Sequence, residues 1–118
     1  MSGTILEDIH AQLDVAKRIG NSSGRPFVTL AYAQSLDGSI AGEDRRPLSL
    51  SSSASLTLTH QLRAAHDVIL VGIGTVLVDD PHLNVRLVDG EDPQPVVVDS
   101  RLRLPDTSRL LNSDRKPW

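Results

Sequence analysis

The stretch that decides the fold is "HDVILVGIGTVLVDDPHLNVR", residues 66–86. Its apolar run at 67–72 predicts a strand that ends in a Gly-x-Gly. Residues 75–80 follow at once and predict a short helix, because Pro81 disfavours helical geometry at Asp80 and limits the helix to about two turns. The stretch therefore predicts a strand that turns directly into a helix, as in an α/β protein.

The flanking sequence predicts two more helices. Residues 4–19 are amphipathic, with Thr4 and Glu7 as a capping box and a C-terminal stop at Gly20-Asn21. Residues 52–65 form the second helix, which Ser51 or Ser52 can cap. Its apolar stripe consists of Ala54, Leu58, Leu62 and Ala65.

Two further segments predict strands, "FVTLAYA" at 27–33 and "PVVVD" at 95–99. All three predicted strands are apolar rather than alternating, which favours a parallel sheet covered on both faces and an α/β layered fold. Residues 100–118 lack a long period and predict an exposed tail or a crossover. Three short parallel strands leave two open edges, so we expect a larger sheet, completed by missing sequence or by a second copy in a homodimer.

Composition excludes several classes of function. The 118 residues carry a net charge of −3 and only 3% aromatic side chains, which argues against nucleic-acid binding. No apolar run approaches the roughly 20 residues of a membrane span, and the N-terminus does not resemble a signal peptide. Cysteine is absent and the four histidines have no metal-ligand spacing, so we expect no metal site and a cytoplasmic protein.

The Gly-Ile-Gly-Thr corner has the features of an anion site. Gly72 and Gly74 lack the Cβ atoms that would keep a phosphate from the backbone, and Thr75 can cap the short helix and offer a hydroxyl. Leu77 occupies the place of the third glycine of a Rossmann fingerprint, which excludes that fold. A tight strand–helix turn without a ligand is the alternative.

Charged residues after the corner extend this hypothesis. Asp79 and Asp80 lie at the unfavourable end of the short helix, so one of them could accept hydrogen bonds from a ribose or from a neighbouring backbone N–H. The alternative is that both acids are simply solvated. Arg86 could hold a phosphate through two hydrogen bonds, or it could be an ordinary surface arginine.

The end of the last predicted strand gives conflicting signals about a nucleotide cofactor. Ser100 and Arg101 suit a phosphate monoester such as the 2′-phosphate of NADP, whereas Asp99 is typical of sites that bind a free 2′-hydroxyl. These residues alone leave the choice of cofactor open.

Three separated blocks together resemble the pyrimidine reductases of riboflavin biosynthesis. The blocks are "RPFVTLAYAQSLDGSIAG", "THQLRAAHDVILVGIGTVLVDDPHLNVR" and "PQPVVVDSRLRLP", and the similarity covers roughly residues 25–111. That family comprises the reductase domain of the bacterial bifunctional deaminase-reductase and stand-alone fungal and archaeal enzymes. The resemblance implies a dihydrofolate-reductase-like α/β fold with a mostly parallel central sheet, incomplete in this chain. It divides the chain into an N-terminal helix and linker at 1–24 and the first part of a reductase domain at 25–118.

The resemblance also implies the activity and the site. The expected reaction is NADPH-dependent reduction of the ribosyl group of a ribosylaminopyrimidine 5′-phosphate to ribityl. Positions that match the cofactor contacts of the family are Thr75, Asp79 and Ser100, beside the glycines Gly72 and Gly74. Positions that match its substrate contacts are Arg63, Leu83 and Arg86.

Three departures from the family pattern qualify these expectations. Ser39 stands where the family often has Lys or Arg, and "PLSLS" lacks the Trp of bacterial members. The family continues for about as many residues again, with a Gly-rich NADP loop and an acidic substrate contact that this chain lacks. Asp37 is a candidate proton donor or an ordinary turn residue, so no catalytic residue is assigned. A truncated, non-catalytic half-domain that associates with another chain or binds a nucleotide is the alternative function.

Overall fold

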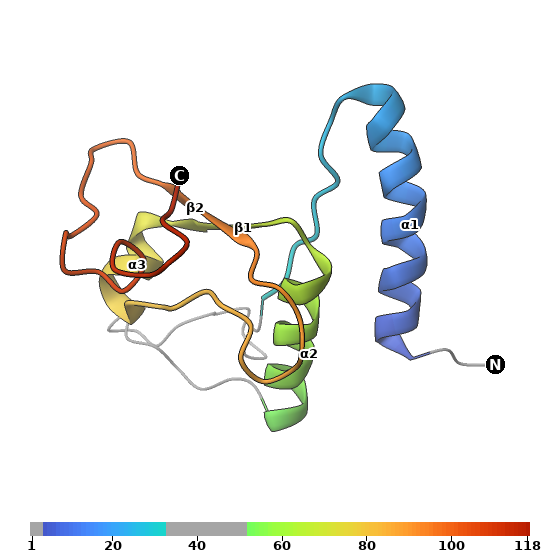
Figure 1. Ribbon diagram of the computed structural model, residues 1–118, viewed down its shortest axis with the longest axis horizontal. Helices are drawn as coiled ribbons and strands as arrows, with labels where there is room; N and C mark the ends of the chain where they lie inside the picture. The colour runs from blue at the N-terminus through green and yellow to red at the C-terminus, as the bar shows by residue number, and fades with distance from the viewer. Residues whose placement is uncertain (1–3, 33–51) are drawn as a thin grey trace, which may run out of the picture. The chain divides into compact units, whose positions relative to one another are not determined.

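A computed structural model describes residues 4–32 and 52–118 (Figure 1). The chain divides into two compact units, residues 1–32 and 33–118. Each unit is described by itself. Asp37, Ser39 and the serines at 49 and 51 lie outside the described residues.

The first unit contains helix α1, Ile5–Ser23. The capping box is confirmed: Thr4 Oγ1 accepts the Glu7 N–H at 3.2 Å, and Glu7 Oε2 accepts the Thr4 N–H at 2.7 Å. The stop predicted at Gly20-Asn21 is wrong, because the helix continues to Ser23. Gly24 ends it instead, with a left-handed φ of 68° and its N–H bonded to the Gly20 carbonyl.

The strand predicted at 27–33 is also wrong over its described part, since residues 27–32 have no strand conformation. A strand requires a hydrogen-bonded neighbour, and among the described residues only 68–72 and 94–98 pair into a sheet. The apolar and β-branched composition of residues 27–32 is therefore suited to a strand, but composition does not specify the neighbouring strand that would pair with it. Its large side chains are exposed in this unit: Phe27, Val28, Leu30 and Tyr32.

The second unit contains the remaining elements in the predicted order. Helix α2 is Ser53–Ala65, strand β1 is Val68–Gly72, helix α3 is Ile73–Asp79 and strand β2 is Gln94–Val98. Ser52 caps α2, because its Oγ accepts the Ser55 N–H at 3.2 Å. The two-turn limit on α3 is confirmed: the helix ends at Asp79, and Asp80 adopts a left-handed conformation before Pro81.

Strands β1 and β2 are parallel, as predicted, with Val68 opposite Gln94 and Gly72 opposite Val98. One face of this pair carries Ile69, Val71 and Val97 and packs against the core. The core itself consists of Ile73, Val76, Leu83 and Leu110. The other face leaves Val68, Leu70 and Val98 between 46% and 63% exposed. An exposed apolar face of this kind is suited to burial under a further layer, and the larger sheet stays a prediction.

The segment after β2 is not an exposed tail. Leu110 is fully buried in the core, and Ser108 is 4% exposed. The main chain of Trp118 donates to the Pro95 carbonyl at 3.0 Å and accepts from the Val97 N–H at 2.9 Å. This is the hydrogen-bond pattern of a parallel neighbour on the second edge of β2. Turns separate the apolar positions of the segment, which is why no period revealed them.

The apolar stripe predicted for α2 is only partly correct. Leu58, Leu62 and Ala65 are half-buried and Ala54 is exposed. The one buried residue of the helix is a polar one, His60, with 2% of its surface exposed. Helix α2 therefore contacts its neighbours through polar as well as apolar side chains, and Figure 1 shows it beside the loop that precedes β2.

Candidate functional site

The Gly-Ile-Gly-Thr corner lies where β1 passes directly into α3. Gly72 is the N-cap residue, with φ −80° and ψ 157°, and no side chain caps the helix. Gly74 and Thr75 are thus the second and third residues of α3, so the prediction that Thr75 caps this helix is wrong. A helix capped by Thr75 would begin at Val76, whereas α3 begins at Ile73, directly after β1. The first amide groups of α3 consequently have no side-chain partner.

The two glycines of this corner are not required by packing or by backbone conformation. Neither has a positive φ, and a Cβ atom added at Gly72 or Gly74 would meet nothing within 4 Å. Gly72, Gly74 and Thr75 are all exposed. The space beside these amides is therefore open to a ligand, which agrees with the hypothesis of an anion site and does not favour a turn that needs glycine for steric reasons.

Sheet register brings Ser100 to the same end of the sheet. Gly72 lies opposite Val98, and Ser100 follows two residues later, exposed in a turn. The corner and Ser100 thus occupy the carboxyl ends of two adjacent parallel strands, which is where open α/β sheets bind their ligands. Four of the five predicted cofactor residues lie there, and Asp79 ends the short helix that starts from it.

The two adjacent aspartates, Asp79 and Asp80, have different roles. Asp80 Oδ1 accepts the backbone N–H of Arg109 at 2.9 Å, and Oδ2 lies 3.6 Å from the Arg109 Nε. The interpretation that one acid accepts a neighbouring backbone N–H is therefore confirmed for Asp80. Asp79 is exposed and makes no such bond among the described residues, so its carboxylate is accessible to a ligand.

Asp99 is engaged by the turn that follows β2. Its Oδ1 accepts the Arg103 N–H at 2.9 Å, and its Oδ2 accepts the Leu104 N–H at 2.8 Å. Both carboxylate oxygens thus stabilise the backbone of the turn, which leaves Asp99 fewer acceptor sites for a ribose 2′-hydroxyl. The sequence contains conflicting indications of cofactor type at this strand end. Ser100 and Arg101, which suit a 2′-phosphate, are exposed, whereas Asp99 is only half-exposed.

A second group of predicted residues surrounds Asn84, in the loop between α3 and β2. Arg63 of α2 donates from Nη1 to the Asn84 carbonyl at 3.0 Å. Arg86 donates from Nη1 to the Asn84 Oδ1 at 2.9 Å. The two predicted substrate arginines, 23 residues apart in sequence, are therefore held by the same asparagine. No carboxylate pairs with either guanidinium in the described part of the chain.

Electrostatics mark this arginine pair as unsatisfied. The Arg63 Nε is buried and has no hydrogen-bond partner, which is costly for a charged donor. Burial and the nearby charge of Arg86 lower the pKa of Arg63. Two cations without a carboxylate between them, one with an unused buried donor, have the charge and the donors that a phosphate requires.

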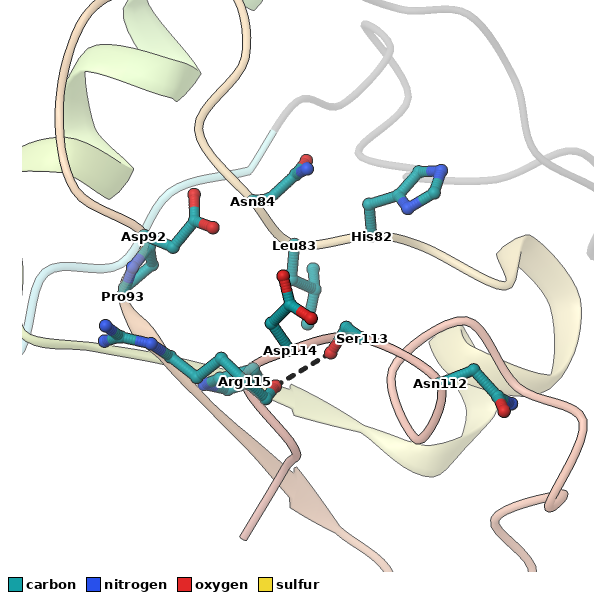
Figure 2. Close-up of a pocket in the computed structure, with 10 residues that line it drawn as sticks. His82, Leu83, Asn84, Asp92, Pro93, Asn112, Ser113, Asp114 and Arg115 are labelled. Carbon is teal, nitrogen blue, oxygen red and sulfur yellow. Dashed lines mark hydrogen bonds between the residues drawn. The ribbon is translucent and has the colours of Figure 1, made fainter.

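Leu83 lies between the core and a cavity. It is 5% exposed, packs with the core residues and has a φ of 55°. A cavity of about 500 Å³ borders it, with walls from Asn84, Asp92, Pro93 and the segment 112–115 (Figure 2). Asn84, which both arginines contact, also lines the cavity, so there is room beside this residue of the predicted phosphate contacts.

The structure thus separates the predicted residues into two groups. The glycine corner and Ser100 lie at the end of the sheet, and Arg63 with Arg86 lies along α2. No hydrogen bond or ion pair joins the groups within residues 52–118. Over the described ranges, no cluster of three potential ligands could hold a metal ion. No helix within those ranges is long and apolar enough to cross a membrane.

Sequence reasoning missed two residues of the arginine group, His60 and Asn84. His60 Nδ1 accepts the Arg86 backbone N–H at 3.1 Å. Its position three residues before Arg63 on a predicted helix was an available signal, because such residues share one helix face. Asn84 gave no signal, since its contacts depend on the course of the loop.

Comparison with known proteins identifies the family to which this chain belongs. Residues 26–118 match the family described as the RibD C-terminal domain. The chain belongs to this family. The 2,5-diamino-6-ribosylamino-4(3H)-pyrimidinone 5′-phosphate reductase of Archaeoglobus fulgidus is 47% identical over 102 residues, which cover 78% of this chain and 47% of that protein. The reductase of the same description from Debaryomyces hansenii is 50% identical over 82 residues, which cover 65% of this chain and 33% of that protein.

Solved structures of RibD proteins confirm the fold class of this RibD C-terminal domain. One form of Acinetobacter baumannii RibD superposes with a TM-score of 0.80 at 34% identity and covers 96% of this chain and 33% of that one. The deaminase/reductase of Thermotoga maritima gives a TM-score of 0.74 at 30% identity, covering 90% of this chain and 32% of that one. The fold is therefore a dihydrofolate-reductase-like α/β fold, present in part. This chain spans less than half the length of these relatives.

Proposed function

We propose that this RibD C-terminal domain chain is part of an NADPH-dependent reductase of riboflavin biosynthesis. Its substrate would be a ribosylaminopyrimidine 5′-phosphate, whose ribosyl group is reduced to ribityl. The observation that carries the proposal is the arginine pair, Arg63 and Arg86, held by Asn84 with a buried and unused Nε. The Archaeoglobus fulgidus relative is described as a 5′-phosphate reductase, and this pair has the chemistry to bind such a phosphate.

On the substrate side, each arginine has a distinct task. Arg63 approaches from α2, with one nitrogen fixed by the Asn84 carbonyl and with Nε unused. Arg86 approaches from the loop and is more exposed. A phosphate between them would receive charge-assisted hydrogen bonds, worth about 1.5–3 kcal/mol each. Leu83 and the adjoining cavity would leave room for the remainder of the substrate.

On the cofactor side, the residues at the strand ends fit a dinucleotide. The amides after Gly72 are uncapped, and the space beside Gly72 and Gly74 is open. Thr75, Asp79 and Ser100 are exposed around them. The engagement of Asp99 with backbone amides supports NADPH over NADH, because Ser100 and Arg101 remain for a 2′-phosphate.

The chemistry follows from this division of labour. Bound NADPH would supply the hydride, which is the difficult step, and the protein would align the two reactants. The arginine pair would fix the phosphate end of the substrate, and the strand ends would fix the cofactor. No residue is assigned as proton donor, and Asp37, the candidate from sequence, lies outside the described residues.

One experiment tests the proposal directly. NADPH oxidation is followed spectrophotometrically with the ribosylaminopyrimidine phosphate, for this chain and for the full-length Archaeoglobus fulgidus reductase as reference. Titrations of the chain with NADPH and with ribose 5-phosphate accompany the assay. Binding of both ligands, with ribose 5-phosphate affinity lost on Arg86→Ala, is the expected result. A chain that binds neither ligand would contradict the proposal.

One observation favours a second function, that of a non-catalytic half-domain. The exposed apolar face of the sheet, formed by Val68, Leu70 and Val98, suits burial against another chain. For both functions we propose that the part of the chain derived from a reductase domain begins at residue 25. We also propose that the chain forms a homodimer and is located in the cytoplasm. Sedimentation equilibrium of the chain measures the assembly, and a dimer without NADPH or ribose 5-phosphate binding would favour the second function.

A further inference from the structure

His60 is the buried residue of α2, although it is polar. Only 2% of its surface is exposed, and a buried imidazole has to be hydrogen-bonded. Its Nδ1 lies 3.1 Å from the backbone nitrogen of Arg86. A backbone N–H can only donate, so Nδ1 accepts, and the neutral ring carries its proton on Nε2. Burial, Arg63 and Arg86 all lower the pKa of His60, which favours this neutral form.

One turn further along α2, Arg63 makes the second contact with the same loop. Its Nη1 donates to the Asn84 carbonyl at 3.0 Å. His60 and Arg63 are three residues apart and share a face of the helix. Helix α2 thus holds the main chain of the loop at two points, Asn84 and Arg86, and this fixes the register of the segment between them.

A close packing contact reinforces this attachment. Gly90, further along the loop, lies so close to α2 that an added Cβ would stand 2.5 Å from the Cβ of Ala64. The Val85 N–H, between the two anchored residues, donates to Asp92 Oδ1 at 2.8 Å and closes the loop on itself. The loop therefore has a defined path along α2.

The hydrogen bond from Arg86 to His60 holds the loop in place against the repulsion between Arg63 and Arg86. The charges of Arg63 and Arg86 repel each other, and this repulsion adds to burial in lowering the pKa of Arg63. Without a main-chain attachment, the loop could relieve the repulsion by moving Arg86 away. Of the two protonation states of His60, only the neutral one provides that attachment, because a protonated imidazole could not accept the N–H and would add a third positive charge.

We propose that His60 is a positioning residue, which fixes the main chain of Arg86 on α2 so that the Arg63 and Arg86 guanidinium groups converge on one phosphate. The inference rests on the proposed function, because it gives that phosphate site its preorganised geometry. His60 itself touches neither ligand in this arrangement. Its effect passes through the position of Arg86.

The test uses the 118-residue chain and two substitutions of similar size. Asn in His60→Asn places its Oδ1 near the position of Nδ1 and can accept the Arg86 N–H, whereas Leu in His60→Leu cannot. Affinity for ribose 5-phosphate is measured by calorimetry at pH 7.5. We expect H60L to weaken binding about tenfold, the equivalent of one such hydrogen bond, and H60N to restore most of it. His10→Leu, at an exposed position of α1, serves as the matched control.

Two further readouts separate positioning from general loss of structure. Affinity for NADPH should be the same in H60L and in the unmodified chain, because the strand ends do not contact His60. In the Arg86→Ala background, H60L should add little further loss of ribose 5-phosphate affinity, since the guanidinium being positioned is already absent. The role of His60 would be overturned if H60L lowered NADPH affinity as much as ribose 5-phosphate affinity. It would also be overturned if the losses of ribose 5-phosphate affinity caused by H60L and by Arg86→Ala were fully additive.

The outcomes also distinguish this inference from the proposed function. If the unmodified chain binds ribose 5-phosphate and Arg86→Ala weakens binding, the phosphate site stands. H60L binding as tightly as the unmodified chain would then overturn the inference alone. If Asn fails to restore what Leu removes, a hydrogen bond to Arg86 is not the mechanism and the inference also fails. An unmodified chain without affinity for ribose 5-phosphate overturns both.

Discussion

Asp80 joins the end of α3 to a segment 29 residues later, because its carboxylate accepts the backbone N–H of Arg109 at 2.9 Å. This contact lies next to Leu110, the most deeply buried side chain of the core. The second carboxylate oxygen is 3.6 Å from the Arg109 Nε, but both side chains are about half exposed. The backbone hydrogen bond, rather than the ion pair, is therefore the structural part of the interaction.

The two neighbouring acids should consequently respond differently to mutation. Asp80→Ala removes the acceptor and places Ala in a left-handed conformation, so we expect a loss of about 1–2 kcal/mol in the free energy of unfolding. Asp80→Asn keeps an acceptor and tolerates that conformation, and should lose less than about 0.5 kcal/mol. Asp79→Ala should leave stability unchanged and weaken NADPH binding. Urea denaturation and NADPH titration measure the two effects, and equal stability losses at both positions would contradict this division.

The glycine corner gives a prediction in which stability and binding move in opposite directions. Gly74 lies inside α3 with open space beside it, so Gly74→Ala should stabilise the chain by about 0.5–1 kcal/mol. The added methyl group would occupy the space proposed for the cofactor, and NADPH affinity should fall. Thr75→Val should lower that affinity as well, without raising stability.

Gly90→Ala provides the contrast for the Gly74 substitution. Its methyl group would meet the Ala64 Cβ at 2.5 Å, and the forced shift should lower the unfolding free energy by about 1–3 kcal/mol. Thermal unfolding of the two glycine variants measures both changes. If Gly74→Ala left NADPH affinity intact, the corner would be an ordinary strand–helix turn.

Asp99 gives a prediction about cofactor choice. Its two oxygens hold the Arg103 and Leu104 amides, so Asp99→Ala should destabilise the turn by about 1–2 kcal/mol. The ratio of NADPH to NADH affinity should stay the same in this variant, because both carboxylate oxygens are engaged by the turn. A ratio that shifts towards NADPH in Asp99→Ala would show that Asp99 contacts the ribose.

The fold was predictable from sequence where a local pattern was sufficient. The change from apolar run to Gly-x-Gly to short helix located β1 and α3 within one or two residues, and Pro81 limited the length of α3. The capping box located the start of α1. These features depend on interactions between residues at most a few positions apart.

The errors arose where distant residues decide the structure. Residues 27–32 have the composition of a strand, but pairing requires a neighbour that composition does not specify. The burial of Leu110 and the pairing of Trp118 with β2 depend on turns without a period. In the site, Arg63 was implied only by family resemblance, whereas Arg86 was also proposed from the residues themselves. Their shared contact with Asn84 was not predicted. The attachment of Arg86 to His60 required the course of the loop.

The neutral state of His60 predicts how stability depends on pH. Burial, Arg63 and Arg86 lower its pKa in the folded chain, whereas a histidine in an unfolded chain has a pKa of about 6.5. Above that pH both states are neutral and the contribution of the Arg86 hydrogen bond is fully present. As the pH falls, the unfolded chain binds the proton first, so the unfolding free energy decreases until the folded pKa is passed.

His60→Asn isolates this effect, because Asn keeps the acceptor and does not titrate. Urea denaturation between pH 8 and pH 5 should show a steeper loss of stability for the unmodified chain than for H60N. All other ionisable groups are the same in the two proteins and cancel in the comparison. The difference between the two curves should therefore be flat above about pH 7 and should open below about pH 6.5, where the imidazole of the unfolded chain becomes protonated. Parallel curves over the whole range would show that His60 is not held neutral by its burial beside the two arginines.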